Sequence, residues 1–356
     1  MDGVVLRVGA SGSGAGCVMQ RSLIKRLHST AVVCASGSGV SFGLIQRLRS
    51  RWGEKVHIIG LDSNPAPLVT ASVVVDEFYT VCQSNERVFL DQISDILDKH
   101  DGAHVYPALN SDFTALSEIR KLEKFRNCDF VCPVDDKIKF VKDKLALFEA
   151  LSAINVPTPK LFTTKDIENG CCDDELFVKP RDGCGSKGAR KVNKKELVTY
   201  DRKLLNSIIV QEVCQKPEVT VDVFIDIVRG DFAAVCRERV EIKAGVCTKA
   251  RIFADKGLEK IAEQLCEFFG MSGGFCFQVM KIFGKWVVID LNFRLGAGTA
   301  LSCAIGADFF SAMHGSRCGE CGIDYIDLSW IKQGDCYVTR QYTEYITRLP
   351  NENNGA

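Results

Sequence analysis

The sequence predicts an α/β protein in two parts: an N-terminal domain with a parallel sheet, followed by a larger unit of mixed α+β character. Two observations support this assignment. Strands and helices alternate between residues 30 and 134, which is typical of a parallel sheet covered by helices on both sides. From about residue 135, helices are interspersed with strands joined by Gly-rich turns. The 356 residues suffice for two or three domains with a buried core.

Composition narrows the classes of partner. Lys plus Arg and Asp plus Glu number 45 each, so nothing indicates a nucleic-acid or membrane-surface partner. No apolar run approaches the roughly 20 residues that span a bilayer. The 17 cysteines are scattered without regular spacing, so we expect reduced thiols in a cytoplasmic protein. Cys318-x-x-Cys321, with His314 upstream, has metal-like spacing, but a single pair is weak evidence for zinc.

The two ends of the chain differ in composition from the rest. Residues 1–29 combine a Gly- and Ser-rich stretch with a basic segment that has no acidic residue, and we expect a disordered extension. A mis-assigned start explains it best, and an organelle-targeting peptide is the alternative. The polar residues 346–356 are expected to form a flexible tail.

The N-terminal domain is expected to cover residues 30–134. Its strands are expected at 30–36, 56–62, 104–107 and 130–134, and its helices at 44–51, 86–100 and 111–125. The first strand runs into a Gly-rich turn and the second ends on Asp62, which invites a dinucleotide interpretation. Phe42 occupies the third glycine position of that motif, so a plain structural domain is favoured.

A Gly-rich basic segment follows the first strand of the second unit. That strand carries Lys179, and an amphipathic helix before it carries Lys144. Three glycines lie within six residues, interleaved with Ser and Lys: Gly183, Gly185, Ser186, Lys187 and Gly188. A flap of this kind can fold its backbone N–H groups around phosphate oxygens while lysine supplies charge, so we interpret it as a phosphate-binding loop.

Two later strands carry candidates for nucleoside and substrate contacts. An apolar strand, which we expect to be buried, ends in Gln211, Glu212 and Val213, and these residues could form hydrogen bonds with the edge of a purine base. Glu218, at the start of the next strand, could hold ribose hydroxyls. Cations then alternate with hydrophobic residues along residues 236–251. The residues Arg237, Arg239, Lys249 and Arg251 could line an anionic site, although surface strands alternate in the same way.

The hairpin at residues 274–298 carries the strongest signal. With a three-residue loop centred on Gly284, Gln278 lies opposite Asp290 and Cys276 opposite Asn292. The even-numbered side chains then share one face, which Arg294 extends. Oxygen ligands of this kind suit Mg²⁺, and Arg suits a phosphate or carboxylate. The alternative is the solvent face of an edge hairpin.

Taken in this order, these residues resemble the ATP-grasp superfamily, most closely the members similar to the large subunit of carbamoyl-phosphate synthetase. The resemblance implies a Rossmann-like pre-ATP-grasp domain at 30–134 and a two-lobed ATP-grasp domain at 135–345, with lobes at 135–210 and 211–345. The implied ATP-binding residues are Lys144, Lys179, Gly183, Gly185, Ser186, Lys187, Gly188, Gln211, Glu212, Val213 and Glu218. The implied metal ligands are Gln278, Asp290 and Asn292, and the implied catalytic residues are Arg294, Lys179 and Arg237.

Two positions depart from the family pattern, which usually reads Glu-x-Asn-Pro-Arg at the metal site. Asp290 replaces the Glu, which keeps a carboxylate on a shorter side chain, and Phe293 replaces the Pro. Neither change removes a metal ligand, so we expect this site to be catalytically active.

The resemblance implies an ATP- and Mg²⁺-dependent ligase, with Mn²⁺ as an alternative metal, that activates a small carboxylate as an acyl phosphate for capture by an amine. Its partners would be those small molecules, without nucleic acid or membrane, and fold analogy suggests a homodimer. The alternatives are a small-molecule kinase, a carbamoyl-phosphate-synthetase-like phosphotransferase and a non-catalytic ATP sensor. A nicotinamide oxidoreductase would leave the second half of the chain unexplained.

Overall fold

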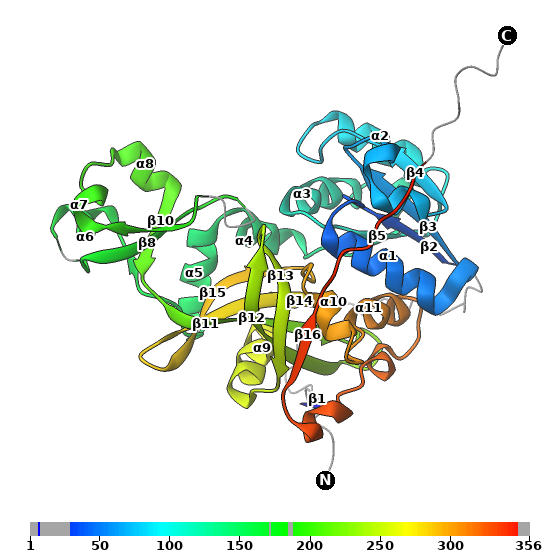
Figure 1. The fold of residues 1–356 in the computed structure, drawn as a ribbon. Coiled ribbons are helices and arrows are strands. Elements are labelled where there is room, and N and C mark those ends of the chain that lie inside the picture. Colours follow the sequence, from blue (N-terminus) through cyan, green and yellow to red (C-terminus); the bar gives the residue numbers. More distant parts are fainter. Residues whose placement is uncertain (1–5, 8–28, 171, 184–187, 348–356) are drawn as a thin grey trace, which may run out of the picture.

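A computed structural model describes residues 6–7, 29–170, 172–183 and 188–347, which are arranged around three β-sheets (Figure 1). The N-terminal sheet is parallel, in the order β4-β3-β2-β5-β6. Its strands are β2 (Ser29–Val33), β3 (Val56–Asp62), β4 (Glu77–Thr80), β5 (His104–Tyr106) and β6 (Asp129–Phe130), and its helices are α1 (Gly39–Trp52), α2 (Val88–Leu97) and α3 (Asn110–Ile119).

Helices cover both faces of this sheet, as the alternation in the sequence predicts. Val32 and Val33 point to opposite faces and both are fully buried. Val33 packs in a core with α1, whereas Val32 packs in a separate core with α2 and α3. Strand β4 was not expected, because its four residues lie at the edge of the sheet and none of them is fully buried.

The Gly-rich turn before α1 is held by Asp62. The Asp62 carboxylate accepts hydrogen bonds from the backbone N–H of Gly37 (2.8 Å) and of Asn64 (2.9 Å). Ser38 caps the helix, because its hydroxyl accepts the N–H of Ser41. The acid that a dinucleotide site would use for a ribose is therefore committed to the turn, which fits a structural domain.

The amphipathic helix expected around Lys144 is two helices, α4 (Ile138–Lys142) and α5 (Lys144–Ala153). Asp143 breaks them apart, since its extended backbone places its side chain to cap the N–H of Leu145 (2.9 Å). The same carboxylate pairs with Arg181 (2.5 Å), at the end of the next lobe's central strand. Lys144 thereby becomes the first residue of a helix.

A small lobe projects from the body of the molecule (Figure 1, left). Its antiparallel sheet has the order β7-β10-β8-β9. The elements are β7 (Leu161–Phe162), α6 (Thr164–Glu168), β8 (Glu175–Pro180), β9 (Arg190–Asn193), α7 (Lys194–Leu197), α8 (Arg202–Ser207) and β10 (Ile208–Glu212). Its hydrophobic core, which includes Leu176, Val178 and Val210, is separate from those of the other sheets.

The third sheet is the largest, in the order β15-β14-β11-β12-β13-β16, with β1 (Leu6–Arg7) beside the start of β12. The other elements are β11 (Gln215–Ile225), β12 (Asp231–Lys243), β13 (Val246–Phe253), α9 (Lys256–Phe269), β14 (Gly273–Ile282), β15 (Lys285–Asn292), α10 (Thr299–Cys303), α11 (Phe309–Arg317) and β16 (Cys336–Thr339). Strand β1 lies inside the expected extension 1–29, and most of that stretch lies outside the described residues.

The large sheet is buried on both faces. Val221 and Val223 of β11 pack with α9 on one face, whereas Phe224 packs with α11 on the other. The core on the α11 face also contains Leu44 and Leu48 of α1, so the N-terminal domain and the large sheet share one hydrophobic core. This sharing positions the start of α1 over the large sheet.

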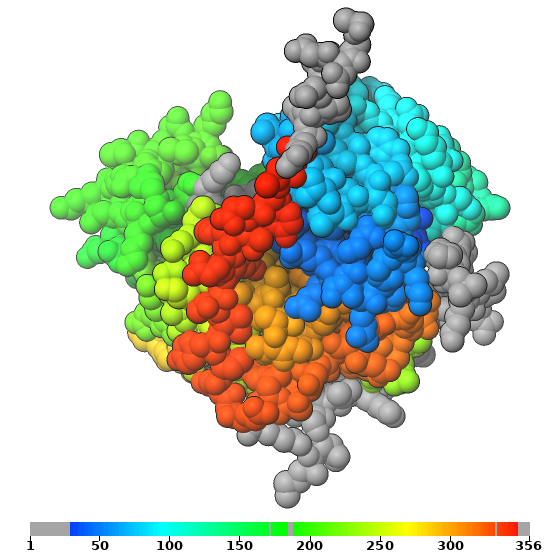
Figure 2. Space-filling model, turned by 45° about the vertical axis from the view of Figure 1, so that its right-hand side comes forward, coloured from blue at the N-terminus to red at the C-terminus, as the bar shows by residue number. Residues whose placement is uncertain are grey.

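The C-terminal part contains two short helices, α10 and α11, and strand β16, which was not expected and extends the edge of the large sheet. The chain then lies along the surface toward the N-terminal domain (Figure 2), where Tyr345 contacts the ring of Phe42 and the side chain of Gln46.

Among the described residues, no helix is both long and apolar enough to cross a membrane.

An ion pair between the largely buried Arg317 and the partly exposed Asp129 links α11 to the N-terminal sheet, and its removal tests the junction. Arg317 contacts both carboxylate oxygens of Asp129 (2.7 and 2.9 Å), and His104 lies 3.1 Å from the same group. Although burial alone raises it, Arg317 and His104 hold the pKa of Asp129 well below its usual range. We expect Arg317→Met to lower the free energy of unfolding by about 3 kcal/mol at pH 7, because Asp129 is left without its counter-ion.

This loss should begin to shrink as the pH falls below about 4, where Asp129 becomes protonated in the unfolded chain, and it should continue to shrink down to the lowered pKa of the native state. Urea denaturation at several pH values measures it. Arg202→Met, which removes an exposed contact with Glu168, is the control and should cost less than about 1 kcal/mol. Equal losses in both variants would contradict the prediction.

Candidate functional site

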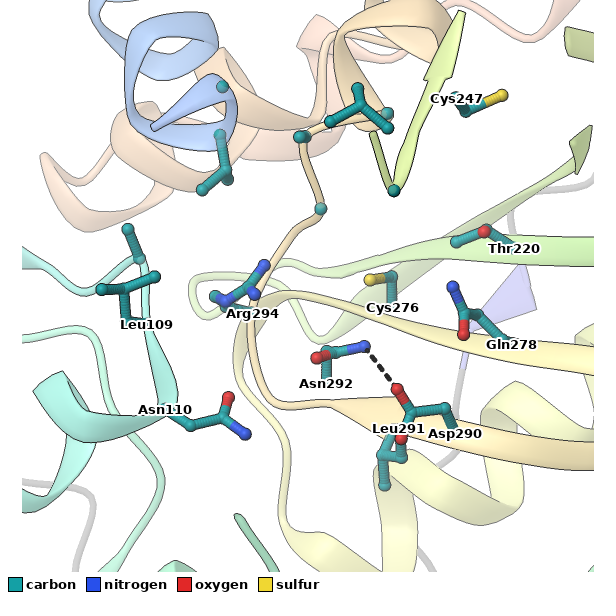
Figure 3. A pocket seen from close by; sticks show the side chains of 18 of the residues that line it. Leu109, Asn110, Thr220, Cys247, Cys276, Gln278, Asp290, Leu291, Asn292 and Arg294 are labelled. Carbon is teal, nitrogen blue, oxygen red and sulfur yellow. Dashed lines mark hydrogen bonds between the residues drawn. The ribbon is translucent and has the colours of Figure 1, made fainter. Parts of the chain in front are cut away.

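The predicted register of the β14–β15 hairpin is confirmed around its polar face. Cys276 pairs with Asn292 and Gln278 pairs with Asp290. The three polar side chains converge on one side of the hairpin (Figure 3), and Asn292 Nδ2 donates a long hydrogen bond to Asp290 Oδ2 (3.5 Å). A carboxylate and two amides therefore lie together on neighbouring strands.

The turn itself has two residues rather than the three expected. Phe283 and Gly284 both have positive φ (47° and 78°), as in the two-residue turns that suit the twist of a hairpin. A bulge restores the register, because Gln278 pairs with Asp290 whereas Val279 pairs with Val288. Ile289 is the extra residue.

The bulge gives the site an anchor for Lys179. The carbonyl of Ile289 accepts a hydrogen bond from Lys179 Nζ (2.7 Å), which reaches across from β8 of the small lobe. The ammonium also lies 4.5 Å from the centre of the Phe148 ring. Burial lowers the pKa of Lys179 to about 8, against the opposing effect of Asp290. Lys179 therefore carries a buried, incompletely compensated charge.

A cavity of about 350 Å³ lies between the small lobe and the large sheet. Several predicted nucleotide contacts line it: Lys144, Lys179, Gly183, Gln211, Val213 and Glu218. Other lining residues, which the sequence did not suggest, are Phe177, Lys191, Cys214, Met280 and Ile289. Their alternation along strands is that of any half-buried sheet, so no sequence signal marked them.

Not every predicted contact faces this cavity. Glu212 is engaged on the other side of its strand, where its carboxylate accepts the N–H of Lys160 (2.7 Å). Gly188 lies against the ring of Pro180, in a neighbouring groove. Gly185, Ser186 and Lys187 lie outside the described residues.

Gln211 has a distinctive environment in this cavity. Its side chain is only 3% exposed, and its Oε1 has no hydrogen-bond partner in the described part of the chain. Buried side-chain oxygens are normally paired, and leaving one unpaired costs about 1–3 kcal/mol. A ligand in the cavity that offers an N–H group would satisfy it.

A second cavity, of about 270 Å³, lies between the large sheet and the N-terminal domain (Figure 3). It shares Lys144, Gly183, Gln278 and Asp290 with the first, so the two cavities meet at the polar hairpin. Lys144 Nζ donates to the carbonyl of Gly183 at this junction (2.5 Å). Residues at the starts of α1 and α3, which sequence reasoning missed, form its far wall: Ser38, Gly39, Leu109 and Asn110.

Arg294 extends from the end of β15 into the second cavity (Figure 3). Its Nη1 donates to the carbonyl of the adjacent Leu295 (2.9 Å), and its buried Nε has no partner among the residues that the structure describes. Arg294 is therefore positioned to bind an anion there.

Arg237 also lines this cavity, but it is already paired. It is 2% exposed, and its Nε and Nη2 donate to the two oxygens of the fully buried Asp222 (3.1 and 3.2 Å). Thr299 and Ser302 donate to the same carboxylate (2.8 and 2.7 Å). A Cβ at Gly298 would meet the guanidinium at 2.2 Å, so a larger residue there would displace Arg237. Arg237 therefore helps to shape the wall of the second cavity, while its positive charge is already neutralised by Asp222.

The remaining predicted cations are also paired. Arg239 lines the second cavity and forms an ion pair with Glu218, the expected ribose ligand. Lys249 pairs with Glu241 (3.0 Å), and Arg251 pairs with Glu238 (2.7 Å). Neither Lys249 nor Arg251 lines either cavity, so for these two the alternation indicated a surface strand.

Phe293 has a packing role. It is buried and meets the ring of Phe269 edge-on, at 5.3 Å between centroids. Its side chain points away from the polar face, so the residue between Asn292 and Arg294 belongs to the core beneath the site.

The Cys318-x-x-Cys321 pair does not form a joint ligand set. Cys318 Sγ faces His314 (3.5 Å) and His104 (3.7 Å), whereas Cys321 Sγ faces Asp226 (3.8 Å). The two thiols contact different partners, which argues against a shared zinc site.

Comparison with known proteins relates this arrangement to a known family of domains. A family model described as ATP-grasp domain matches residues 141–298. No curated protein sequence matches the chain. The residues of the polar hairpin, both lysines and the Gly-rich segment all fall within the matched range.

Solved structures share the fold. N5-carboxyaminoimidazole synthetase from Staphylococcus aureus complexed with ADP is 15% identical, with a TM-score of 0.66 over 83% of this chain and 79% of that chain. N5-carboxyaminoimidazole ribonucleotide synthetase from Thermotoga maritima is 17% identical, with a TM-score of 0.61 over 82% and 76%. The predicted fold class is confirmed.

A third similar structure is the biotin carboxylase domain dimer of 2-oxoglutarate carboxylase from Hydrogenobacter thermophilus, in complex with MgADP, ADP and bicarbonate. It is 14% identical to this chain, with a TM-score of 0.65 over 83% of this chain and 70% of that chain. At these identities the likeness concerns the fold.

The buried charge of Lys179 yields a stability prediction. Because the native state lowers its pKa to about 8, the native state disfavours the charged form, which costs stability below pH 8. We expect Lys179→Met to raise the free energy of unfolding at pH 7 by up to about 3 kcal/mol. The gain should decline as the pH rises from 8 toward 10.4. In this range Lys179 is already neutral in the native wild type, and it loses its proton progressively in the unfolded chain as well.

Chemical denaturation between pH 7 and 10 measures this difference. Lys124→Met, at a lysine on the surface of the N-terminal domain, is the control and should show little pH dependence. A destabilised Lys179→Met at pH 7 would show that the hydrogen bond to Ile289 outweighs the burial of the charge.

Proposed function

We propose, from the ATP-grasp domain that the chain contains at residues 141–298, that this protein is an ATP- and Mg²⁺-dependent carboxylate-amine ligase. The observation that carries the proposal is the meeting of two cavities at one polar hairpin, where Lys144, Gly183, Gln278 and Asp290 belong to both. A nucleotide in one cavity and a small acid in the other would bring their reacting ends together at this junction.

The cavity between the small lobe and the large sheet suits ATP. Apolar side chains such as Phe177 and Met280 line it beside the unpaired oxygen of Gln211, which would accept a hydrogen bond from the amino group of adenine. Lys144 and Lys179 lie at its inner end, where the phosphates would be. Structures of similar fold were determined with ADP or MgADP, which supports this assignment.

The polar hairpin suits Mg²⁺. Gln278, Asp290 and Asn292 would hold the ion through oxygen ligands, the type that Mg²⁺ and Mn²⁺ prefer. When bound, the metal supplies positive charge that offsets the charge on the phosphates. The shorter Asp290 retains the carboxylate that this role needs.

The second cavity suits the carboxylate substrate. A carboxylate oxygen attacks the γ-phosphorus of ATP, the O–P bond forms, the bond to ADP breaks, and an acyl phosphate results. An amine nitrogen then attacks the acyl carbon, a C–N bond forms and inorganic phosphate leaves. Arg294 would hold the carboxylate and the transferred phosphoryl group, while Lys144 and Lys179 would stabilise its charge.

The N-terminal domain forms the roof of the reaction chamber. Leu109 and Asn110, at the start of α3, face Arg294 and Asn292 across the cavity (Figure 3). Such a cover keeps water from hydrolysing an acyl phosphate before the amine arrives. Such a cover fits a ligase, because the acyl phosphate must last until the amine attacks it. In the described part of the chain all cysteines are free, in keeping with a cytoplasmic protein.

ADP release tests the proposal. We expect purified protein with ATP and Mg²⁺ to release ADP when a suitable pool of small carboxylates and amines is added, and Asp290→Asn to lower the rate at least 100-fold. Phe283→Ser, at the exposed hairpin turn, is the control and should retain activity. ATP binding without release in any pool would favour a sensor, and a phosphorylated product without a C–N bond would favour a kinase.

The role of Gln211 has a separate test with two opposite readouts. Gln211→Leu removes a buried oxygen without a partner, so we expect the free protein to gain about 1–3 kcal/mol in stability. The same change removes an acceptor for adenine, so ATP affinity should fall roughly tenfold. Thermal denaturation and calorimetric titration measure the two effects. Unchanged ATP affinity would show that Gln211 does not contact the base.

A further inference from the structure

We infer that the N-terminal domain holds a second metal site, formed by His57, Glu77 and His100 and suited to a zinc-like transition metal. One ligand atom from each residue lies within 4.8 Å of the other two. Glu77 Oε1 lies between the histidines, 2.7 Å from His57 Nε2 and 3.8 Å from His100 Nε2. The inference is independent of the proposed ligase function.

Three chain segments bring these residues together. Glu77 opens the edge strand β4, in register with Ile59 of β3, and His57 lies two residues before Ile59 on the same face of the sheet. His100 follows α2, and its ring stacks on that of His57 at 5.9 Å between centroids. The cluster therefore joins β3, β4 and the end of α2.

Neighbouring groups support the cluster as outer partners support metal ligands. Tyr79 Oη donates to Glu77 Oε2 (2.6 Å), which leaves Oε1 as the oxygen that faces both histidines. Asp76 Oδ2 lies 3.9 Å from the other ring nitrogen of His57, and it is held in place by Arg49 (2.7 Å) and by the N–H of Ile58. Asp76 is beyond hydrogen-bond distance of His57, so Tyr79 is the outer partner that contacts a proposed ligand through a hydrogen bond.

The donor atoms select the class of metal. Two imidazole nitrogens and one carboxylate oxygen suit Zn²⁺ and its neighbours Co²⁺ and Ni²⁺, with a fourth position left for water. Mg²⁺ prefers oxygen ligands, so it suits the hairpin and not this cluster.

The site lies away from the two cavities. His57 and Glu77 are at the amino ends of their strands, whereas Ser38 and Leu109, which line the second cavity, follow the carboxyl ends of β2 and β5. A bound ion would cross-link the short edge strand β4 to β3 and to the segment after α2. Its effect is thus on the stability of the N-terminal domain.

Cobalt titration of the full-length protein, with Mg²⁺ in excess, tests the inference and distinguishes this site from cysteine ligands. We expect one equivalent of Co²⁺ to give visible d–d bands without the near-ultraviolet charge-transfer band of a cobalt–thiolate bond. His57→Asn, His100→Asn and Glu77→Gln should each weaken binding at least tenfold, and Tyr79→Phe should weaken it by 10- to 100-fold. Zn²⁺ should compete for the same site.

Glu54→Gln, at an exposed carboxylate just before β3, is the matched control and should bind Co²⁺ as the wild type does. Far-ultraviolet circular dichroism establishes that each variant is folded. Co²⁺ should raise the melting temperature of the wild type, whereas it should not raise the melting temperature of the three ligand variants. The inference is overturned if Co²⁺ does not bind, if binding survives in the ligand variants, or if the spectrum shows thiolate ligation.

Discussion

The buried carboxylate of Asp222 is the interaction on which the architecture of the site depends. Four hydrogen bonds converge on it, two from Arg237 and one each from Thr299 and Ser302. Because a buried charge without partners is very costly, this arrangement ties β11, β12 and α10 into one geometry. Thr299 also accepts the N–H of Gly296, so the loop after Arg294 is held against the same group. The position of Arg294 in the second cavity follows from this anchoring.

The β14–β15 hairpin joins the two halves of the site. Its bulge at Ile289 exposes a carbonyl that holds Lys179 from the small lobe, while its polar face presents Asp290 to both cavities. A small lobe with a separate core is attached to the large sheet through such contacts, so it can move as a unit without disturbing either core. The first cavity is thus formed on one side by the large sheet and on the other side by the small lobe, which has its own core.

The N-terminal domain contributes shape to the second cavity. Asp62 is used to hold its Gly-rich turn, and α1 shares a hydrophobic core with the large sheet. The start of α1 and the start of α3 therefore reach the second cavity, where they line the side opposite Arg294.

The sequence alone determined the alternation of strands and helices in the N-terminal domain and the pairing of Gln278 with Asp290, and it singled out Lys144 and Lys179, which both line the first cavity. These features depend on local periodicity and on motif order. It also assigned Glu218 to ribose hydroxyls and assigned Arg237 and Arg239 to an anionic ligand, whereas in the structure Glu218 pairs with Arg239 and Arg237 pairs with Asp222. Ion pairs between distant strands, the unpaired oxygen of Gln211 and the joining of two cavities arise from tertiary packing. Local patterns carry no information on which distant side chain will meet a given charge, so only the folded structure decided these points.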